Sequence, residues 1–166
     1  KALEGYQTSG SWSIASGGGL GSALNISESI RYKTFQLGSN TFKVKVPLTT
    51  ELEQMTERYL AVDESLLKDR LEKMTVAIRA SGQENVEITE DDVIVDGKSS
   101  KETVKSIIQM EQRITEYVKL LVPADGEIND LTYAEIEEVF PLQIQLELLE
   151  NIIDAIQPGY KDAQKN

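Results

Sequence analysis

Apolar and polar residues alternate along residues 32–46, with a short polar break in the middle. The apolar positions are Phe35, Leu37, Phe42, Val44 and Val46. The break is Gly38-Ser39-Asn40, which consists of residues that favour tight turns. Period-two alternation on both sides of such a turn predicts a β-hairpin with one buried face. Pro47 is expected to end the second strand, because proline has no backbone N–H to donate.

The apolar spacing becomes helical after the hairpin. Leu52, Met55, Tyr59 and Leu60 predict a first helix, and Thr50 with Glu53 has the pattern of a capping box at its start. A second apolar face consists of Leu67, Leu71, Met74 and Ile78. Asp63 either caps this second helix or lies inside one long helix, and the pattern allows both. Gly82 is expected to end it.

An acidic stretch between Gly82 and Gly97 predicts either two short strands or one strand and a turn. Its apolar residues are Val86, Ile88, Val93, Ile94 and Val95. Ser99 with Glu102 then forms a second capping box, which opens a long helix. The apolar face of that helix is Val104, Ile107, Ile108, Ile114, Val118 and Leu121. Pro123 is expected to end the helix.

Two further helices are predicted near the end of the chain. Thr132 with Glu135 forms a third capping box, before a short helix through Ile136 and Val139. Pro141 suits the first turn of a last helix. The predicted apolar face of this helix is Leu142, Leu146, Leu149, Ile153 and Ile156. Together these elements predict an α+β fold that is mostly α, with an N-terminal β-hairpin followed by a helical bundle.

Composition separates the two ends of the chain from this pattern. Residues 1–22 hold six of the 11 glycines and end in Gly21-Ser22, so we interpret them as a flexible segment or linker derived from an expression vector. A natural flexible arm, or a tethered partner peptide containing Tyr6, Trp12 and Ile14, is the alternative. We expect residues 23–157 to form a single globular domain and residues 158–166 to form a polar tail.

The composition also restricts the chemistry available to the protein. The chain has no cysteine and no histidine, which removes thiol nucleophiles, zinc thiolate sites and the usual general base. The formal net charge is −11, which argues against binding to nucleic acid or to an anionic membrane surface. No apolar run is long enough to span a membrane. We therefore expect a binding protein without a cofactor or a catalytic residue, not an enzyme.

Two acidic segments are the best candidates for a metal site. Asp125-Gly126-Glu127-Ile128-Asn129 is similar to the second half of an EF-hand loop. Aligning Gly126 with the loop glycine, however, places Leu121, Pro123 and Thr132 at ligand positions, so the spacing argues against calcium. The second segment is Glu90-Asp91-Asp92 with Asp96, which we interpret as a solvated loop, because no phosphate-binding loop accompanies it. The sequence therefore predicts no metal ligand.

Two surfaces are candidates for protein binding. The apolar face of the last helix suits a partner groove, although such a face more often packs in a core. The hairpin carries Lys43 and Lys45 on its outer face, and its edges can accept a partner strand. Lysine on an edge strand also prevents aggregation, and that interpretation is the simpler one. No individual partner-binding residue can be assigned from the sequence.

The order of these elements resembles that of a known protein family. The run Tyr32-Lys33-Thr34-Phe35-Gln36-Leu37-Gly38-Ser39-Asn40-Thr41-Phe42-Lys43-Val44-Lys45-Val46-Pro47-Leu48-Thr49 leads directly into acidic helices. It resembles the opening of the tail assembly chaperones of long-tailed, siphovirus-type bacteriophages. The segment from Phe140-Pro141-Leu142 to Ile156-Gln157-Pro158 resembles their final helix. The resemblance covers most of residues 23–166. It consists of the general pattern of residue types and the order of the elements, and it includes no diagnostic motif.

This resemblance implies a role in virion morphogenesis in the host cytoplasm. Such chaperones bind the tape measure protein, keep it soluble, help to recruit tail tube subunits and are absent from the mature virion. The implied partners are these phage tail proteins, and further copies of the chain if it forms a homo-oligomer. A structural virion component, such as a neck or tail protein, and a non-phage protein-interaction adaptor domain are the alternatives.

Overall fold

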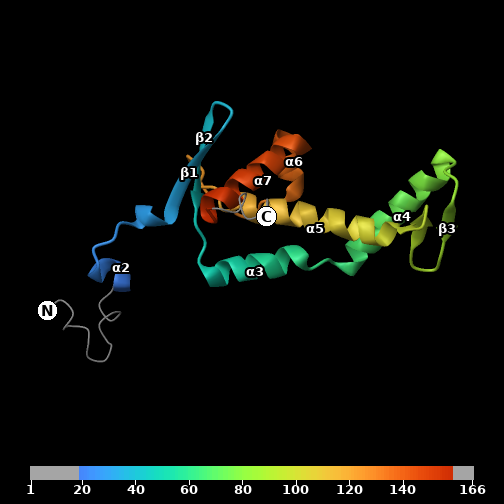
Figure 1. The fold of residues 1–166 in the computed structure, drawn as a ribbon, viewed down its shortest axis with the longest axis horizontal. Coiled ribbons are helices and arrows are strands. Elements are labelled where there is room, and N and C mark those ends of the chain that lie inside the picture. The colour runs from blue at the N-terminus through green and yellow to red at the C-terminus, as the bar shows by residue number, and fades with distance from the viewer. Residues whose placement is uncertain (1–18, 159–166) are drawn as a thin grey trace, which may run out of the picture.

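The computed structural model describes residues 19–158. Within this range the protein is a mixed α+β protein that is mostly helical, and an N-terminal hairpin precedes the main helices, as predicted. The molecule is elongated, and helix α5 (Ser100–Val118) runs through its middle (Figure 1). The other elements divide into two groups along α5, which we call the proximal lobe and the distal lobe. No helix in the described range is both long enough and apolar enough to cross a bilayer.

The predicted hairpin is confirmed. Strand β1 (Tyr32–Leu37) pairs antiparallel with β2 (Asn40–Lys45), and Gly38 in the turn has a φ of 66°. The rings of Phe35 and Phe42, which lie opposite each other, stack with centroids 5.3 Å apart. A left-handed φ favours glycine, so the turn residue that the sequence supplies matches the conformation that the turn requires.

Within the described residues, two short helices precede the hairpin. The 3-10 helix η3 (Glu28–Arg31) leads directly into β1. Helix α2 (Gly19–Ala23) buries none of its residues. It lies across the expected boundary at residue 22, while residues 1–18 of the expected linker and residues 159–166 of the expected tail are outside the described range.

The proximal lobe consists of the hairpin, the second half of α5 and three further helices. These are α3 (Thr49–Leu60), α6 (Tyr133–Val139) and α7 (Leu142–Ile156). They enclose the larger of two apolar cores, whose buried residues are Val44, Met55, Ile114, Tyr117, Val118, Ile136, Leu148, Leu149, Ile152 and Ile153. The hairpin and α7 lie on one side of α5, and α3 lies on the other (Figure 1).

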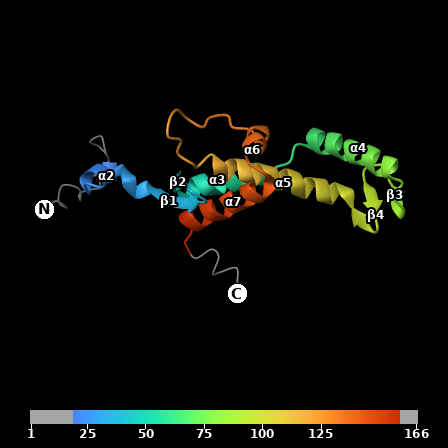
Figure 2. The same cartoon turned by 90° about the horizontal axis from the view of Figure 1, so that it is seen from above.

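The distal lobe consists of α4 (Glu64–Ser81), the first half of α5 and a small sheet. The sheet contains β3 (Val86–Ile88), β4 (Val93–Val95) and β5 (Lys98–Ser99) in the order β3-β4-β5. Two strands between Gly82 and Gly97 were one of the two predicted alternatives, and this one is confirmed. The core of the lobe is small: Leu67, Val104 and Ile108 form its buried apolar cluster, and Val93 of β4 is also buried. Figure 2 shows α4 beside α5 and away from α3, α6 and α7.

Asp63 caps a separate helix, which decides between the two alternatives for residues 49–81. Its Oδ1 accepts hydrogen bonds from the backbone N–H groups of Ser65 (2.8 Å) and Leu66 (3.2 Å). A hydrogen bond from the Ser65 hydroxyl is the main reason why the pKa of Asp63 is lowered, and these two backbone hydrogen bonds lower it further. The predicted stop is also confirmed, because Gly82 adopts a φ of 69° at the end of α4.

The predicted capping box at Thr50 and Glu53 is wrong. Helix α3 begins at Thr49, and the Leu48 backbone N–H donates to Glu51 Oε1 at 2.7 Å. This hydrogen bond is the main reason why the pKa of Glu51 is lowered, and an ion pair with Arg31 (2.9 Å) lowers it further. The helix starts earlier because Arg31, at the base of the hairpin, holds the Glu51 carboxylate at this position.

The predicted apolar face of α7 is partly wrong. Leu142 and Leu146 are 49% and 41% exposed, whereas Leu148 and Ile152 are fully buried. The face is rotated because α7 packs against β1, β2 and α5 together, and not against one neighbouring helix. Pro141 lies immediately before the first residue of α7 and not within its first turn.

Helix α5 differs from its prediction in the exposure of one residue and in the position where the helix ends. Ser99 is confirmed as the N-cap, since its hydroxyl accepts from the Glu102 N–H at 3.1 Å. The predicted capping box is incomplete, because the Ser99 N–H does not donate back to the Glu102 carboxylate. Ile107, however, is 38% exposed, although it was expected on the apolar face. The helix ends at Val118, before Pro123, and Leu121 forms a β-bridge with Val44 of the hairpin. The pairing of residues 120–122 with β2 therefore replaces the last predicted turn of the helix.

The short helix near residue 132 agrees with its prediction. The Thr132 hydroxyl accepts from the Glu135 N–H at 3.3 Å, and Glu135 Oε1 accepts from the Thr132 N–H at 3.3 Å. Both hydrogen bonds of the capping box are therefore present at the start of α6. Ile136 is buried, so this cap fixes where the helix enters the proximal core.

Candidate protein-binding surfaces

The distal lobe contains an open groove with a volume of about 450 Å³ between α4 and the β3–β4 turn. Its apolar lining consists of Leu67, Leu71, Ile88 and Val93. Leu67 and Val93 are buried at its base, whereas Ile88 is 46% exposed. We call this surface the distal groove.

Charged residues surround the distal groove on both sides. The acidic ones are Glu64, Glu72, Glu90 and Asp91, and the basic ones are Lys68 and Lys101. The carboxylates outnumber the ammonium groups, so the rim is acidic. An apolar base with an acidic rim favours a segment that presents apolar side chains flanked by lysine or arginine.

The distal lobe is attached to the proximal lobe by polar side chains of α5. Arg70 of α4 forms two hydrogen bonds with Glu111, at 2.7 and 3.0 Å, and these raise the pKa of Arg70. Gln112 donates to the carbonyl oxygens of Tyr59 (2.9 Å) and Ala61 (2.7 Å) at the end of α3. These contacts fix the direction of the chain between α3 and α4, and they hold one wall of the distal groove in place.

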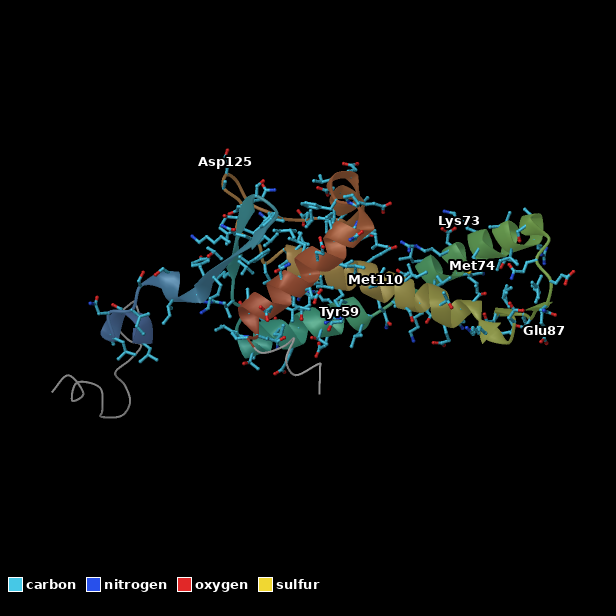
Figure 3. All side chains as sticks on the ribbon, turned by 45° about the horizontal axis from the view of Figure 1, so that its top comes forward. Tyr59, Lys73, Met74, Glu87, Met110 and Asp125 are labelled. Atoms are coloured by element: carbon cyan, nitrogen blue, oxygen red, sulfur yellow. The ribbon has the colours of Figure 1, made fainter. Side chains whose placement is uncertain are left out.

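A second groove, of about 490 Å³, lies where α5, α6 and α7 meet. Its lining includes Ile107, Met110, Phe140 and Leu142. Ile107 and Leu142, which the sequence pattern assigned to core faces, are both exposed on this surface. We call it the central groove. Figure 3 places Met110 beside the crossing of α5 and α7.

A buried hydrogen-bond network supports the central groove. Gln145, which is 1% exposed, accepts from the Tyr133 hydroxyl at 2.7 Å and donates to the Phe140 carbonyl at 2.8 Å. Burial raises the pKa of Tyr133. The network is satisfied within the protein, so it orders the turn between α6 and α7 and does not provide a reactive group.

The hairpin presents a basic face, as predicted, but among residues 19–158 only its β1 edge is open. Residues 120–122 cover the outer edge of β2. The Lys45 N–H donates to the Leu120 carbonyl at 2.9 Å, and the Val122 N–H donates to the Lys43 carbonyl at 2.8 Å. The expectation that both edges can accept a partner strand is therefore corrected for β2, because the chain itself occupies this edge.

One member of the acidic segment 90–96 has a structural role. Asp92 Oδ1 accepts from the N–H groups of Val93 (2.7 Å) and Lys101 (2.8 Å), and Oδ2 accepts from the Ser99 hydroxyl. Partial burial raises the pKa of Asp92, but these three hydrogen bonds together outweigh it and lower the pKa. Asp92 thus connects the β3–β4 turn to the start of α5. Glu90, Asp91 and Asp96 are exposed.

The segment with the partial EF-hand pattern lies in an exposed loop. Gly126 has a φ of 80°, and the Asn129 amide donates to the Glu127 carboxylate. Asp125 lies at the outer end of this loop (Figure 3). Across residues 19–158, no group of three or more carboxylates is placed so that it could hold a metal ion.

Sequence patterns did not identify either groove. Their apolar residues come from elements that are distant in the sequence, and each residue fits a helical or strand pattern on its own. The one sequence signal for the central groove was Ile107. This residue makes the apolar face of its helix wider than packing against one neighbouring helix requires. The chain matches no family model, and no curated protein or solved structure is significantly similar to it.

Proposed function

We propose that this protein is a tail assembly chaperone of a long-tailed bacteriophage. In this role it binds the tape measure protein in the host cytoplasm, keeps it soluble, helps to recruit tail tube subunits and does not remain in the virion. It acts by binding, without a cofactor and without catalysis. The resemblance of residues 32–49 and 140–158 to this family suggests the role.

The distal groove is the observation that carries this proposal. A chaperone for a long helical client must cover apolar side chains that recur at helical spacing. The groove offers an apolar base, an exposed Ile88 and a charged rim, and it lies on the lobe with the smaller core. A lobe with few buried contacts can adapt to successive client segments at a low cost in free energy.

Co-expression with the tape measure protein tests the proposal directly. The tagged chaperone is expected to retain this long, helix-rich protein in the soluble fraction and in a pull-down. The proposal would be contradicted if the tape measure protein stayed in the insoluble fraction and the pull-down recovered the chaperone without it. Mass spectrometry of purified virions provides a second test, because a chain present at a fixed copy number would identify a structural component instead.

Matched substitutions locate the client site. Ile88→Glu places a charge in the distal groove and is expected to reduce client recovery at least fivefold. Val76→Glu is the control, because Val76 is 67% exposed on α4 and does not line the groove. Leu142→Glu tests the central groove. Loss of binding only with Leu142→Glu would move the client site to the central groove.

A further inference from the structure

The hairpin region has a charge opposite to that of the rest of the molecule. Residues 29–50 contain four basic residues, Arg31, Lys33, Lys43 and Lys45, and no acidic residue. The other 13 basic residues and all 28 acidic residues lie elsewhere in the chain. Lys43 and Lys45 lie on the outer face of the hairpin, whereas Lys33, which lies across from Val44, is on the other face. A protein with a net charge of −11 therefore presents a local positive face at Lys43 and Lys45.

Part of this positive charge lies outside ion pairs, although Lys45 also helps to lower the pKa of Glu51. Arg31 pairs with Glu51, but no ion pair links Lys33, Lys43 or Lys45 to any residue in the described range. Lys43 Nζ lies 4.6 Å from the centre of the Tyr32 ring, so Tyr32 holds the ammonium group over the outer face of the hairpin. All three lysines are exposed.

The same face is bounded by the open edge of β1. The Val46 N–H donates to the Arg31 carbonyl, and antiparallel pairing alternates from residue to residue. The backbone N–H and C=O groups of Thr34 and Gln36 therefore point away from β2. Among the described residues, none forms a backbone hydrogen bond with these groups. Because residues 120–122 occupy the edge of β2, β1 provides the free edge of this sheet.

We propose that the β1 edge binds an extended, acidic segment of a partner protein. Backbone groups of the segment would pair with Thr34 and Gln36 and add a strand to the sheet. Lys43 lies directly across from Thr34 in the β1–β2 register. Thr34 is small, so the Lys43 side chain can extend over it towards carboxylates at alternate positions of the added strand. This site is separate from both grooves and provides a second binding surface for the proposed chaperone.

The chemistry selects an acidic peptide over nucleic acid. A nucleic-acid site requires a basic surface large enough to neutralise several phosphates, and the net charge of −11 opposes the approach of a polyanion over long range. A short peptide with alternating carboxylates needs only local charge and a free strand edge. The hairpin provides both.

Fluorescence anisotropy with a defined probe tests this site. The probe is a labelled ten-residue peptide of alternating glutamate and threonine, and the same peptide with glutamine replacing glutamate is the reference. The glutamate peptide is expected to bind about tenfold more tightly at low salt, and the difference should shrink as salt is raised. Equal binding of both peptides, or tighter binding of a ten-nucleotide single-stranded RNA, would overturn the proposal.

Charge substitutions assign the binding to the hairpin. Lys43→Gln with Lys45→Gln is expected to weaken peptide binding by about two- to fivefold for each lysine. Lys73→Gln with Lys105→Gln changes the net charge equally at exposed positions outside the hairpin, and it should leave binding unchanged. An equal effect of both double variants would show that net charge alone attracts the peptide, which contradicts a specific site.

A backbone substitution tests strand addition. Gln36→Pro removes an N–H that points away from β2, so the hairpin keeps its own hydrogen bonds. It is expected to abolish peptide binding, while Gln36→Val should retain it. Amide NMR spectra of both variants verify the hairpin, and the peptide should shift the Thr34 and Gln36 amide signals in the natural chain. Binding that survives Gln36→Pro, or self-association of the free chain through this edge, would overturn the proposal.

Discussion

Asp92 shows how one carboxylate can determine the geometry of a surface. It accepts hydrogen bonds from Val93, Lys101 and Ser99, and so it connects the β3–β4 turn, which forms one wall of the distal groove, to the start of α5. The acidic composition of residues 90–96 suggested a solvated loop, because runs of charged residues are usually exposed. The three hydrogen bonds could not be predicted, since Asp92 and Lys101 are brought together only by the fold.

We expect Asp92→Asn to destabilise the protein by about 1–2 kcal/mol at neutral pH, because hydrogen bonds to a charged acceptor are lost. The pKa of Asp92 is lowered by folding. Its stabilising contribution is therefore complete above the unfolded value of about 3.9, and it is lost as the pH falls through the lower folded value. Urea denaturation at pH 7 and at pH 3 measures this, and the difference between natural chain and variant should narrow at pH 3.

Two leucines of α7 provide a matched test of the helix face. Leu148 is fully buried and Leu146 is 41% exposed, although the sequence pattern assigned Leu146 to the core. Leu148→Ala is expected to cost about 2–5 kcal/mol in free energy of unfolding, and Leu146→Ala less than about 1 kcal/mol. Equal losses in thermal denaturation would mean that α7 buries Leu146 and Leu148 to the same extent.

At the scale of elements, local signals identified most helices and both hairpin strands. Capping residues at Ser99 and Thr132, and glycines at positions 38 and 82, mark element ends through contacts within a few residues. The break between α3 and α4 was ambiguous because it depends on Gln112, whose amide reaches the carbonyls of Tyr59 and Ala61 from another helix. Such long-range contacts have no signature in a local pattern.

The two halves of α5 are expected to differ in stability. Ile108 lies in the distal core and Ile114 in the proximal core, and both are nearly fully buried. Ile108→Ala should accelerate amide hydrogen exchange in α4 while exchange in α7 stays unchanged. Ile114→Ala should accelerate exchange in α7. Mass spectrometry of peptides from each helix measures this, and identical exchange profiles for the two variants would contradict separate cores.

At the scale of the whole molecule, all the aromatic residues within the described range, residues 19–158, lie in the proximal lobe. No Phe, Trp or Tyr occurs between Tyr59 and Tyr117, so the distal lobe contains none. The ring centroids of Tyr59 and Tyr117 lie 6.3 Å apart in the proximal lobe, where Figure 3 labels Tyr59. Near-UV circular dichroism from this pair therefore reports on the proximal lobe, whereas far-UV circular dichroism reports on the helices of both lobes.

We expect the distal lobe to unfold first, because its buried apolar cluster has three residues and that of the proximal lobe has ten. In urea, loss of far-UV signal should begin before loss of near-UV signal, so the two transitions should not coincide. Ile108→Ala should widen the separation. Coincident transitions in the natural chain would indicate that α5 couples the lobes into one cooperative unit.

The sequence by itself determined the fold class, the hairpin, the element order and the absence of cysteine and histidine chemistry. These follow from periodicity and capping, which depend on residues close together in the sequence, and from composition, which is a property of the whole chain. Only the tertiary structure decided which face of α7 is buried, how α5 divides into two cores, where the grooves lie and which edge of the hairpin is free. Each of these depends on contacts between segments distant in the sequence, such as residues 120–122 against β2, and no local pattern encodes them.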